Sequence, residues 1–158
     1  MYIKGKNRVA GFTLIELLLV IAVIVALAVT VYVALNPTKR LADARDARRT
    51  ADVDAILAAT HQYIVDNKGA LPTGVSTTTE MQIGTATTGC TVTTGTCSTA
   101  AACVDLSAPL ASYLKTIPVD PKAGTASSTL YSIVSNANGI VTVKACGAEN
   151  VPSITSSR

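Results

Sequence analysis

The sequence predicts an α+β protein, in which a long N-terminal helix packs against a small antiparallel β-sheet head domain that disulfides stabilise. Three observations support this fold class. Almost every residue from Phe12 to Leu35 is apolar. A helical pattern without Gly or Pro then runs from Thr38 to Asn67. Near the end of the chain, two stretches of alternating apolar and polar residues flank an Asn-Gly pair, which predicts a β-hairpin.

The apolar run is long enough to cross a membrane. Its 24 residues would form a helix of about 36 Å, and a bilayer core is about 30 Å thick. The run contains one charged residue, Glu16. A carboxylate within lipid costs about 2.5–3.5 kcal/mol and is therefore a candidate functional group. The alternative is that Glu16 lies only about 6 Å from the helix start and reaches the lipid headgroups.

The second part of the predicted helix changes character along its length. Pro37 predicts a kink or a break, because it has no N–H to donate to the preceding turn. The next residues are charged on all sides, with neighbours of opposite sign in Arg48/Asp52 and Asp46/Arg49. An apolar face follows, formed by Val53, Ile56, Leu57, Thr60, Tyr63 and Ile64. Gly69 and Pro72 then end the helix.

The predicted head domain combines a polar loop with a terminal hairpin. Thirteen of the 24 residues in 76–99 are Ser or Thr, which predicts an exposed loop with at most short strands. This composition permits O-glycosylation, although a plain polar loop is the simpler interpretation. Residues 106–114 predict a short helix that begins near Ser107 and Pro109. A hairpin is predicted for residues 129–145, packed on the apolar face of the helix.

Composition and charge exclude several classes of function. The formal net charge is +3, and Lys4, Lys6 and Arg8 precede the apolar run. Without that leader the chain has ten basic and ten acidic residues, so no strong field attracts nucleic acid, and aromatic residues that could stack bases are few. No G-x-S-x-G motif, phosphate-binding Gly loop or Ser/His/Asp order indicates an enzyme. The single histidine, His61, is expected at the helix surface or the edge of its apolar face.

All four cysteines follow the apolar run and are expected outside the membrane as disulfides. They are Cys90, Cys97, Cys103 and Cys146, and they allow three pairings. We favour Cys90–Cys97 within the Thr-rich loop and Cys103–Cys146 between the loop region and the last strand. Zinc binding is disfavoured, because no C-x2–4-C pair occurs and the chain has one histidine.

The stretch G-F-T-L-I-E at residues 11–16, after a short basic leader, resembles the processing site of type IV prepilins and pseudopilins. The resemblance implies that a membrane peptidase cuts between Gly11 and Phe12 on the cytoplasmic side. It further implies that Phe12 is N-methylated and that Glu16 guides subunit assembly. Many type IV pilins also close a C-terminal loop with one disulfide, which Cys103–Cys146 would resemble.

A second segment, I-P-V-D-P at residues 117–121, resembles the major pseudopilins of type II secretion and some type IV pilins. Major pseudopilins typically lack cysteines and hold their C-terminal region with calcium. By that resemblance Asp105, Asp120 and Glu149 are candidate calcium ligands, but no D-x-D-x-D-G loop supports them, and Asp120 more simply caps a turn. No cofactor is therefore predicted.

The resemblance implies a structural subunit that polymerises with itself into a type IV pilus. The alternatives are a major pseudopilin and, less favoured, a monomeric membrane-anchored binding module. The expected organisation is a cleaved leader (1–11), a transmembrane and filament-core helix (12–35), an amphipathic helix (36–68) and a globular head (69–158). The expected partners are the prepilin peptidase and the pilus assembly machinery. The precursor would lie in the inner or cytoplasmic membrane before it joins a filament on the cell surface.

Overall fold

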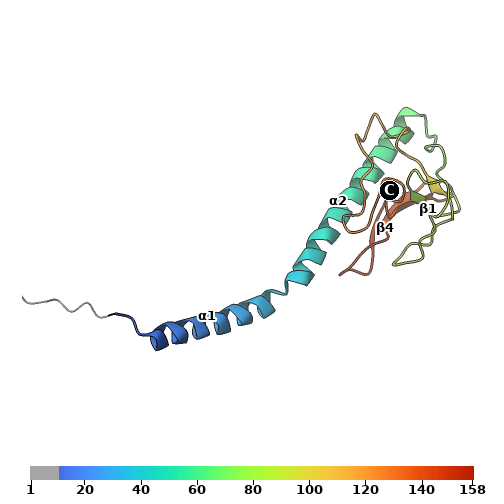
Figure 1. The fold of residues 1–158 in the computed structure, drawn as a ribbon. Coiled ribbons are helices and arrows are strands. Elements are labelled where there is room, and N and C mark those ends of the chain that lie inside the picture. The colour runs from blue at the N-terminus through green and yellow to red at the C-terminus, as the bar shows by residue number, and fades with distance from the viewer. Residues whose placement is uncertain (1–10) are drawn as a thin grey trace, which may run out of the picture. The chain divides into compact units, whose positions relative to one another are not determined.

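The computed structural model describes residues 11–158, so the predicted basic leader lies outside the described residues except for Gly11. The described chain forms two compact units, of which one ends at Arg40 and the other spans Leu41–Arg158. Helix α1 (Leu14–Leu35) belongs to the first unit, and helix α2 (Pro37–Asp66) continues into the second. Five strands complete the second unit (Figure 1). The predicted α+β fold is confirmed.

Helix α1 begins with a capping box. Thr13 is the N-cap, and its hydroxyl accepts a hydrogen bond from the Glu16 N–H at 3.3 Å. The Glu16 carboxylate accepts in return from the backbone N–H of Thr13 at 2.8 Å. The helix ends at Leu35, because Asn36 adopts a left-handed conformation with φ 40°. The interruption predicted at Pro37 is thus a single-residue break at Asn36, and Pro37 occupies the first position of α2.

Helix α1 meets the length and composition expected of a membrane span. The apolar window near the N-terminus has a mean hydropathy of 3.0, and none of it is buried within the described chain. No residue of α1 is buried. The large side chains from Leu14 to Leu35 therefore remain exposed in the part of the chain that the structure describes, and need lipid or other subunits around them.

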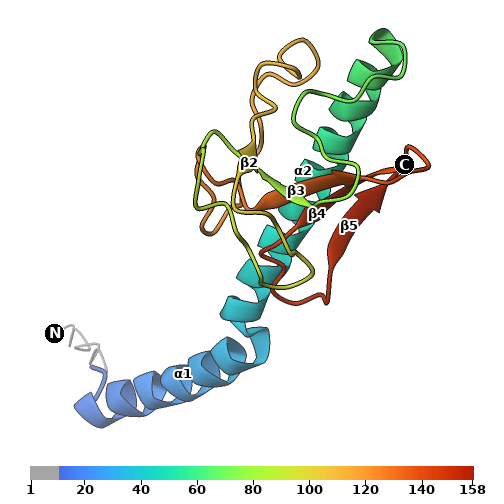
Figure 2. The ribbon, with the colours of Figure 1, turned by 90° about the vertical axis from the view of Figure 1, so that its right-hand side faces the viewer.

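The second unit contains one five-stranded sheet in the order β2-β1-β3-β4-β5. Its strands are β1 (Met81–Ile83), β2 (Cys103–Val104), β3 (Tyr131–Ser135), β4 (Val141–Ala145) and β5 (Ile154–Ser157). The pairs are antiparallel except for β1 and β2, which are parallel. Figure 2 shows α2 lying alongside the sheet.

The core lies between α2 and the sheet. The predicted apolar face supplies Val53, Ile56 and Leu57, all at most 3% exposed, with Tyr63 and Ile64 packed at its edge. The sheet supplies Ile83, Tyr131, Ile133, Val141 and Val143. Helix α2 stops where predicted: Gly69 adopts φ 92°, and its N–H donates to the Ile64 carbonyl at 2.8 Å.

The predicted hairpin is confirmed as β3 and β4, with Tyr131 opposite Ala145. Its connection differs in detail from a two-residue Asn-Gly turn. Only Gly139 has a positive φ, and the Asn136 side chain accepts from the N–H groups of Asn138 and Ile140 at 2.9 Å each. The connection is therefore a five-residue loop organised by Asn136.

Two features of the head differ from expectation. The helix predicted for residues 106–114 is wrong: the segment forms turns that bury Leu106 and Leu110, and only isolated bonds such as Leu110 N–H to Leu106 O at 3.0 Å occur. These two leucines, four residues apart, both pack into the core. A compact turn is enough to bury them, so no longer helix is needed. Strand β5 was not predicted, because it has only four residues and three of them are polar.

Candidate functional site

The predicted processing and assembly residues lie at the start of α1, and the structure brings Thr13 and Glu16 together. Phe12 is 85% exposed. A Cβ added at Gly11 would meet no atom within 4 Å, so the fold of the chain itself does not require glycine at that position. Any requirement for Gly11 would therefore come from a molecule that acts on the chain.

Glu16 has hydrogen-bond partners within its own chain. Its Oε2 accepts from the Thr13 N–H and from the Thr13 hydroxyl, each at 2.8 Å. The carboxylate thus lies over the first turn of α1, where unpaired N–H groups favour negative charge. This local partner was not predicted, although T-x-x-E is the usual sequence pattern of a capping box.

A second cluster of charged side chains lies in the head, and Arg49 is its centre. Arg49 is fully buried, and its Nε donates to Asp120 Oδ2 at 2.6 Å. Its Nη1 donates to Asp46 Oδ1 at 2.8 Å and to Glu149 Oε1 at 2.9 Å. We call this set of six residues the Arg49 cluster: it comprises Arg45, Asp46, Arg49, Asp120, Lys122 and Glu149.

The Arg49 cluster holds the loop between β4 and β5 against α2. Asp46 accepts from the backbone N–H groups of Glu149 at 3.1 Å and Asn150 at 2.8 Å. Arg45 forms two bonds of 2.7 Å to the Glu149 carboxylate. Gly147 permits the close approach, because a Cβ there would lie 2.7 Å from Asp120 Oδ2. With three cations and three carboxylates, the cluster is neutral overall.

These contacts lower the pKa values of the three carboxylates in the Arg49 cluster. Burial alone would raise the pKa of Asp120, but the bonds from Arg49 and from the backbone of Lys122 and Ala123 hold it below the ordinary value. Burial would likewise raise the pKa of Asp46, and bonds from Asn150, Arg49 and Glu149 lower it. Hydrogen bonds from Arg45, Lys122 and Arg49 lower the pKa of Glu149. All three carboxylates are therefore charged at neutral pH.

The three acids considered as calcium ligands do not form one group. Asp120 and Glu149 converge, but on the Arg49 guanidinium. Asp105 instead accepts from the Ser107 N–H and hydroxyl at 2.9 and 2.6 Å. Among residues 11–158, no group of three or more His, Cys, Asp or Glu is arranged to hold a metal ion. The predicted turn-capping role of Asp120 is confirmed by its bonds from the Lys122 and Ala123 N–H groups.

The favoured disulfide pairing is wrong, although all four cysteines are bonded. The disulfides are Cys90–Cys103 and Cys97–Cys146. The loop folds back on itself, with the Cys90 N–H bonded to Ala101 O at 3.0 Å, and this places Cys90 beside β2. Cys97 lies instead against the sheet, 3.4 Å from the Ser132 hydroxyl and next to the end of β4. Sequence spacing could not reveal this reversal of the loop.

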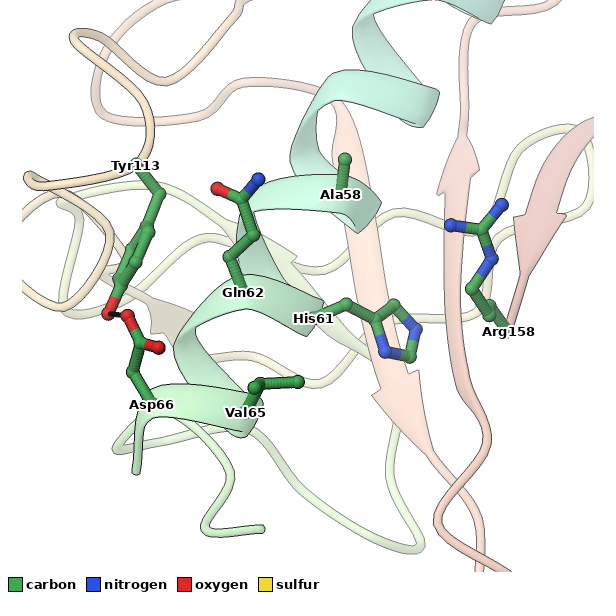
Figure 3. A pocket seen from close by; sticks show the side chains of 7 residues that line it. All are labelled: Ala58, His61, Gln62, Val65, Asp66, Tyr113 and Arg158. Atoms are coloured by element: carbon green, nitrogen blue, oxygen red, sulfur yellow. Dashed lines mark hydrogen bonds between the residues drawn. The ribbon is translucent and has the colours of Figure 1, made fainter. Parts of the chain in front are cut away.

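An open groove of about 500 Å³ lies along the C-terminal half of α2 (Figure 3). On one side of α2, the Tyr113 hydroxyl donates a 2.7 Å hydrogen bond to Asp66. His61 and Arg158 line the groove on the opposite side of the helix. His61 is half-buried on α2. Its Nε2 has no hydrogen-bond partner among the described residues.

The Arg49 cluster is the feature that sequence reasoning missed. The Asp46/Arg49 and Arg48/Asp52 pairs were predicted and are present at 2.8 and 3.8 Å. The burial of Arg49 was not predicted. Arg49 precedes Val53 and Ile56 by one and two helical turns, so extending the apolar face backward would have placed it in the core.

Comparison with known proteins identifies the N-terminal segment. Residues 6–32 match the family described as the prokaryotic N-terminal methylation motif, so the chain carries a type IV prepilin-like leader. No curated protein and no solved structure matches the chain. The motif supports a type IV pilin- or pseudopilin-like protein whose precursor is anchored in a membrane. It also implies processing by prepilin peptidase and assembly into a pilus-like polymer.

Proposed function

We propose that this chain is the structural subunit of a type IV pilus, that its precursor lies in the inner or cytoplasmic membrane, and that the polymer lies on the cell surface. One observation carries the proposal: the methylation motif runs into helix α1, which has no buried residue and whose single charge, Glu16, is the fifth residue after the predicted cut. A helix of this kind needs lipid around it before assembly and other subunits after it.

The leader residues have successive roles in this proposal. Cleavage after Gly11 frees the amine of Phe12, which is then methylated and remains positively charged. Within one chain, the new amine on Phe12 lies just before the N-cap residue Thr13, and Glu16 lies in the first turn of α1. In a polymer of parallel helices with axial offsets, the amine of an incoming subunit pairs with the Glu16 carboxylate of a subunit already in place. A subunit docked in the wrong register would leave both charges unpaired in an apolar setting, where an unpaired charge is expensive.

A pseudopilin of type II secretion is the second candidate, and the I-P-V-D-P segment favours it. Two observations support the pilus instead. The head contains two disulfides, whereas by the resemblance major pseudopilins typically lack cysteines. Asp120 of that segment binds Arg49, which also binds Glu149 in the loop after β4, so a side-chain cation holds this region where a major pseudopilin would use calcium.

The test compares Glu16→Leu, Glu16→Gln and Thr13→Ala in cells that make no wild-type subunit. We expect both Glu16 variants to be cleaved and to accumulate in the membrane, since Leu removes a costly charge, but to fail in polymerisation. Thr13→Ala is the matched control: it removes the capping hydroxyl, keeps the carboxylate and should still assemble. The measurement is electron microscopy of filaments sheared from the cell surface, with mass spectrometry of their subunit.

The outcomes separate the candidates. Filaments of normal number and length from Glu16→Leu would refute the pairing role of Glu16. A wild-type chain that reaches no filament and remains a monomer in the membrane would instead favour an anchored binding module. Loss of protein secretion without loss of surface filaments, on deletion of the chain, would favour the pseudopilin.

A further inference from the structure

The loop that follows β1 has an unusual chemical composition. No charged residue occurs between Glu80 and Asp105, and eight of the 15 residues in 85–99 are threonine. We call residues 85–99 the threonine loop. It contains two glycines with positive φ, Gly89 at 79° and Gly95 at 61°, which turn the chain twice.

The threonines of this loop fall into two groups. Thr99 is buried, at 7% exposed, and its hydroxyl donates to Cys90 O at 2.6 Å and accepts from the Val92 N–H at 2.7 Å. The other seven are exposed, and Thr85 has one long bond of 3.4 Å to Ala126 O. Within the described chain, no side-chain hydrogen bond is found for the remaining six, which are Thr87, Thr88, Thr91, Thr93, Thr94 and Thr96.

The fold holds this loop in place without using those six hydroxyls. Its inner side is anchored by a small apolar cluster of Val92, Cys97 and Cys146, with Leu130 packed against it. The two disulfides attach Cys90 to β2 and Cys97 to the end of β4. The six threonines thus form a fixed, uncharged and solvent-exposed set of hydroxyls on an otherwise anchored segment.

We infer that the threonine loop is an O-glycosylation site, modified at one or more of these six hydroxyls. The acceptor oxygen, Thr Oγ1, attacks the anomeric carbon of a sugar activated as a glycosyl diphosphate. The bond from that carbon to the diphosphate oxygen breaks, the diphosphate leaves with the bonding electrons, and the hydroxyl proton passes to a base of the transferase. The loop shares its high content of hydroxyl residues with O-glycosylated mucin-like segments, although residues 85–99 contain no proline.

Charge gives a physical reason for the modification. Without its leader the chain has ten residues of each sign, and proteins near zero net charge tend to associate and precipitate. Hydrated sugars on an uncharged loop would keep surfaces of neighbouring heads apart without adding charge. The inference requires that the head be exported, as proposed above, but it does not depend on whether the exported chain forms a pilus.

The experiment uses the mature protein purified from its own cells. After reduction of the disulfides, trypsin releases residues 69–115 as one peptide, because no Lys or Arg occurs between Lys68 and Lys115. We expect this peptide to exceed its sequence mass by whole sugar residues, and electron-transfer fragmentation to place them between Thr87 and Thr96. The N-methyl group lies on a different peptide and does not interfere.

Two variants, one with six threonines replaced and one with three, provide the comparison. Replacement of all six threonines by Ala should abolish the mass excess and increase aggregation at neutral pH. The matched control replaces Thr77, Thr78 and Thr79 by Ala. These three threonines are also exposed and lie in the same peptide, before the threonine loop. The control should retain the full mass excess.

A wild-type peptide at its sequence mass, or sugars on the control residues alone, would overturn the inference. The wild-type result stands even if the sixfold variant does not fold. A mature N-terminus at Phe12 with an unmodified peptide would reject glycosylation and leave the proposed function intact. Sugars on a chain that never assembles would instead support glycosylation and reject the proposed function.

Discussion

Replacing Arg49 by Met should destabilise the head strongly and in a way that depends on pH. Methionine keeps an unbranched apolar side chain where the arginine stem is buried, but removes the guanidinium that three carboxylates share. The two most buried of these are Asp46 and Asp120, whose side chains are 8% and 1% exposed. The variant therefore retains carboxylates whose counter-charge has gone.

Burial sets the magnitude of this effect. Removing one partner of a buried ion pair costs about 3–5 kcal/mol, because the remaining charge has no compensation. Arg48→Met is the matched control on the same helix. Its side chain is 65% exposed and lies 3.8 Å from Asp52, and a surface pair of this kind contributes about 0.5 kcal/mol or less. The two arginines are adjacent in sequence, so the difference reports burial rather than helix propensity.

The sign of the pH dependence distinguishes this mechanism from lost packing. In the wild type, the pKa values of Asp46, Asp120 and Glu149 are lowered from ordinary values of 3.8 and 4.5. Their contribution is therefore present above those ordinary values and is lost as the pH falls. Without Arg49, buried carboxylates should have raised pKa values, so the variant gains stability, relative to the wild type, as the pH falls. The difference should be largest at pH 7 and shrink towards pH 4.

The assay is urea unfolding of the mature chain in detergent micelles, followed by near-UV circular dichroism of the tyrosines. The chain has no Trp, and Tyr131 lies fully buried in the core of the head. A free-energy difference below about 1 kcal/mol at pH 7, or one that stays constant from pH 7 to pH 4, would refute this account of the Arg49 cluster.

The remaining predictions concern processing and the disulfides. Gly11→Ala should block cleavage, since the chain itself has room for a Cβ there and only the peptidase would reject it; N-terminal sequencing that still finds Phe12 first would contradict this. Replacing Cys97 and Cys146 by Ser should lower the urea midpoint more than replacing Cys90 and Cys103. The first pair closes a sequence separation of 49 residues and the second one of 13, worth about 4 and 3 kcal/mol by loop entropy. Equal midpoints would indicate that residual structure in the unfolded chain cancels the difference.

Elements with a strong repeating pattern were predictable from the sequence. The face of α2 from Val53 to Ile64 follows helical spacing and packs on the sheet, and β3 and β4 alternate as a hairpin should. Strand β5 lacked such a pattern. Three of its four residues are Ser or Thr, and it pairs only because the preceding loop returns the chain alongside β4.

Features that depend on tertiary distance were not predictable. Four cysteines allow three pairings, and the observed one arises because the chain turns back after the threonine loop, so that the Cys90 N–H bonds to Ala101 O and Cys90 reaches Cys103. The Arg49 cluster joins residues 71 and 100 positions apart in sequence, so no local spacing connects them. The sequence indicates Asp120 and Glu149 as acids near each other, but the cation between them, Arg49, lies on α2, where its local partner Asp46 already accounts for it.

The capping box at the start of α1 affects how easily subunits can both join and leave a polymer. Glu16 is already bonded to Thr13 within its own chain, through the N–H and hydroxyl at 2.8 Å each. On the proposed mechanism, docking therefore exchanges one set of partners for another, and a bare carboxylate is never left in the lipid. The same holds in reverse, because a subunit that leaves the polymer recovers its internal bonds as the intersubunit pair separates. Exchange of this kind lowers the barrier in both directions, so that subunits could return to the membrane and be used again.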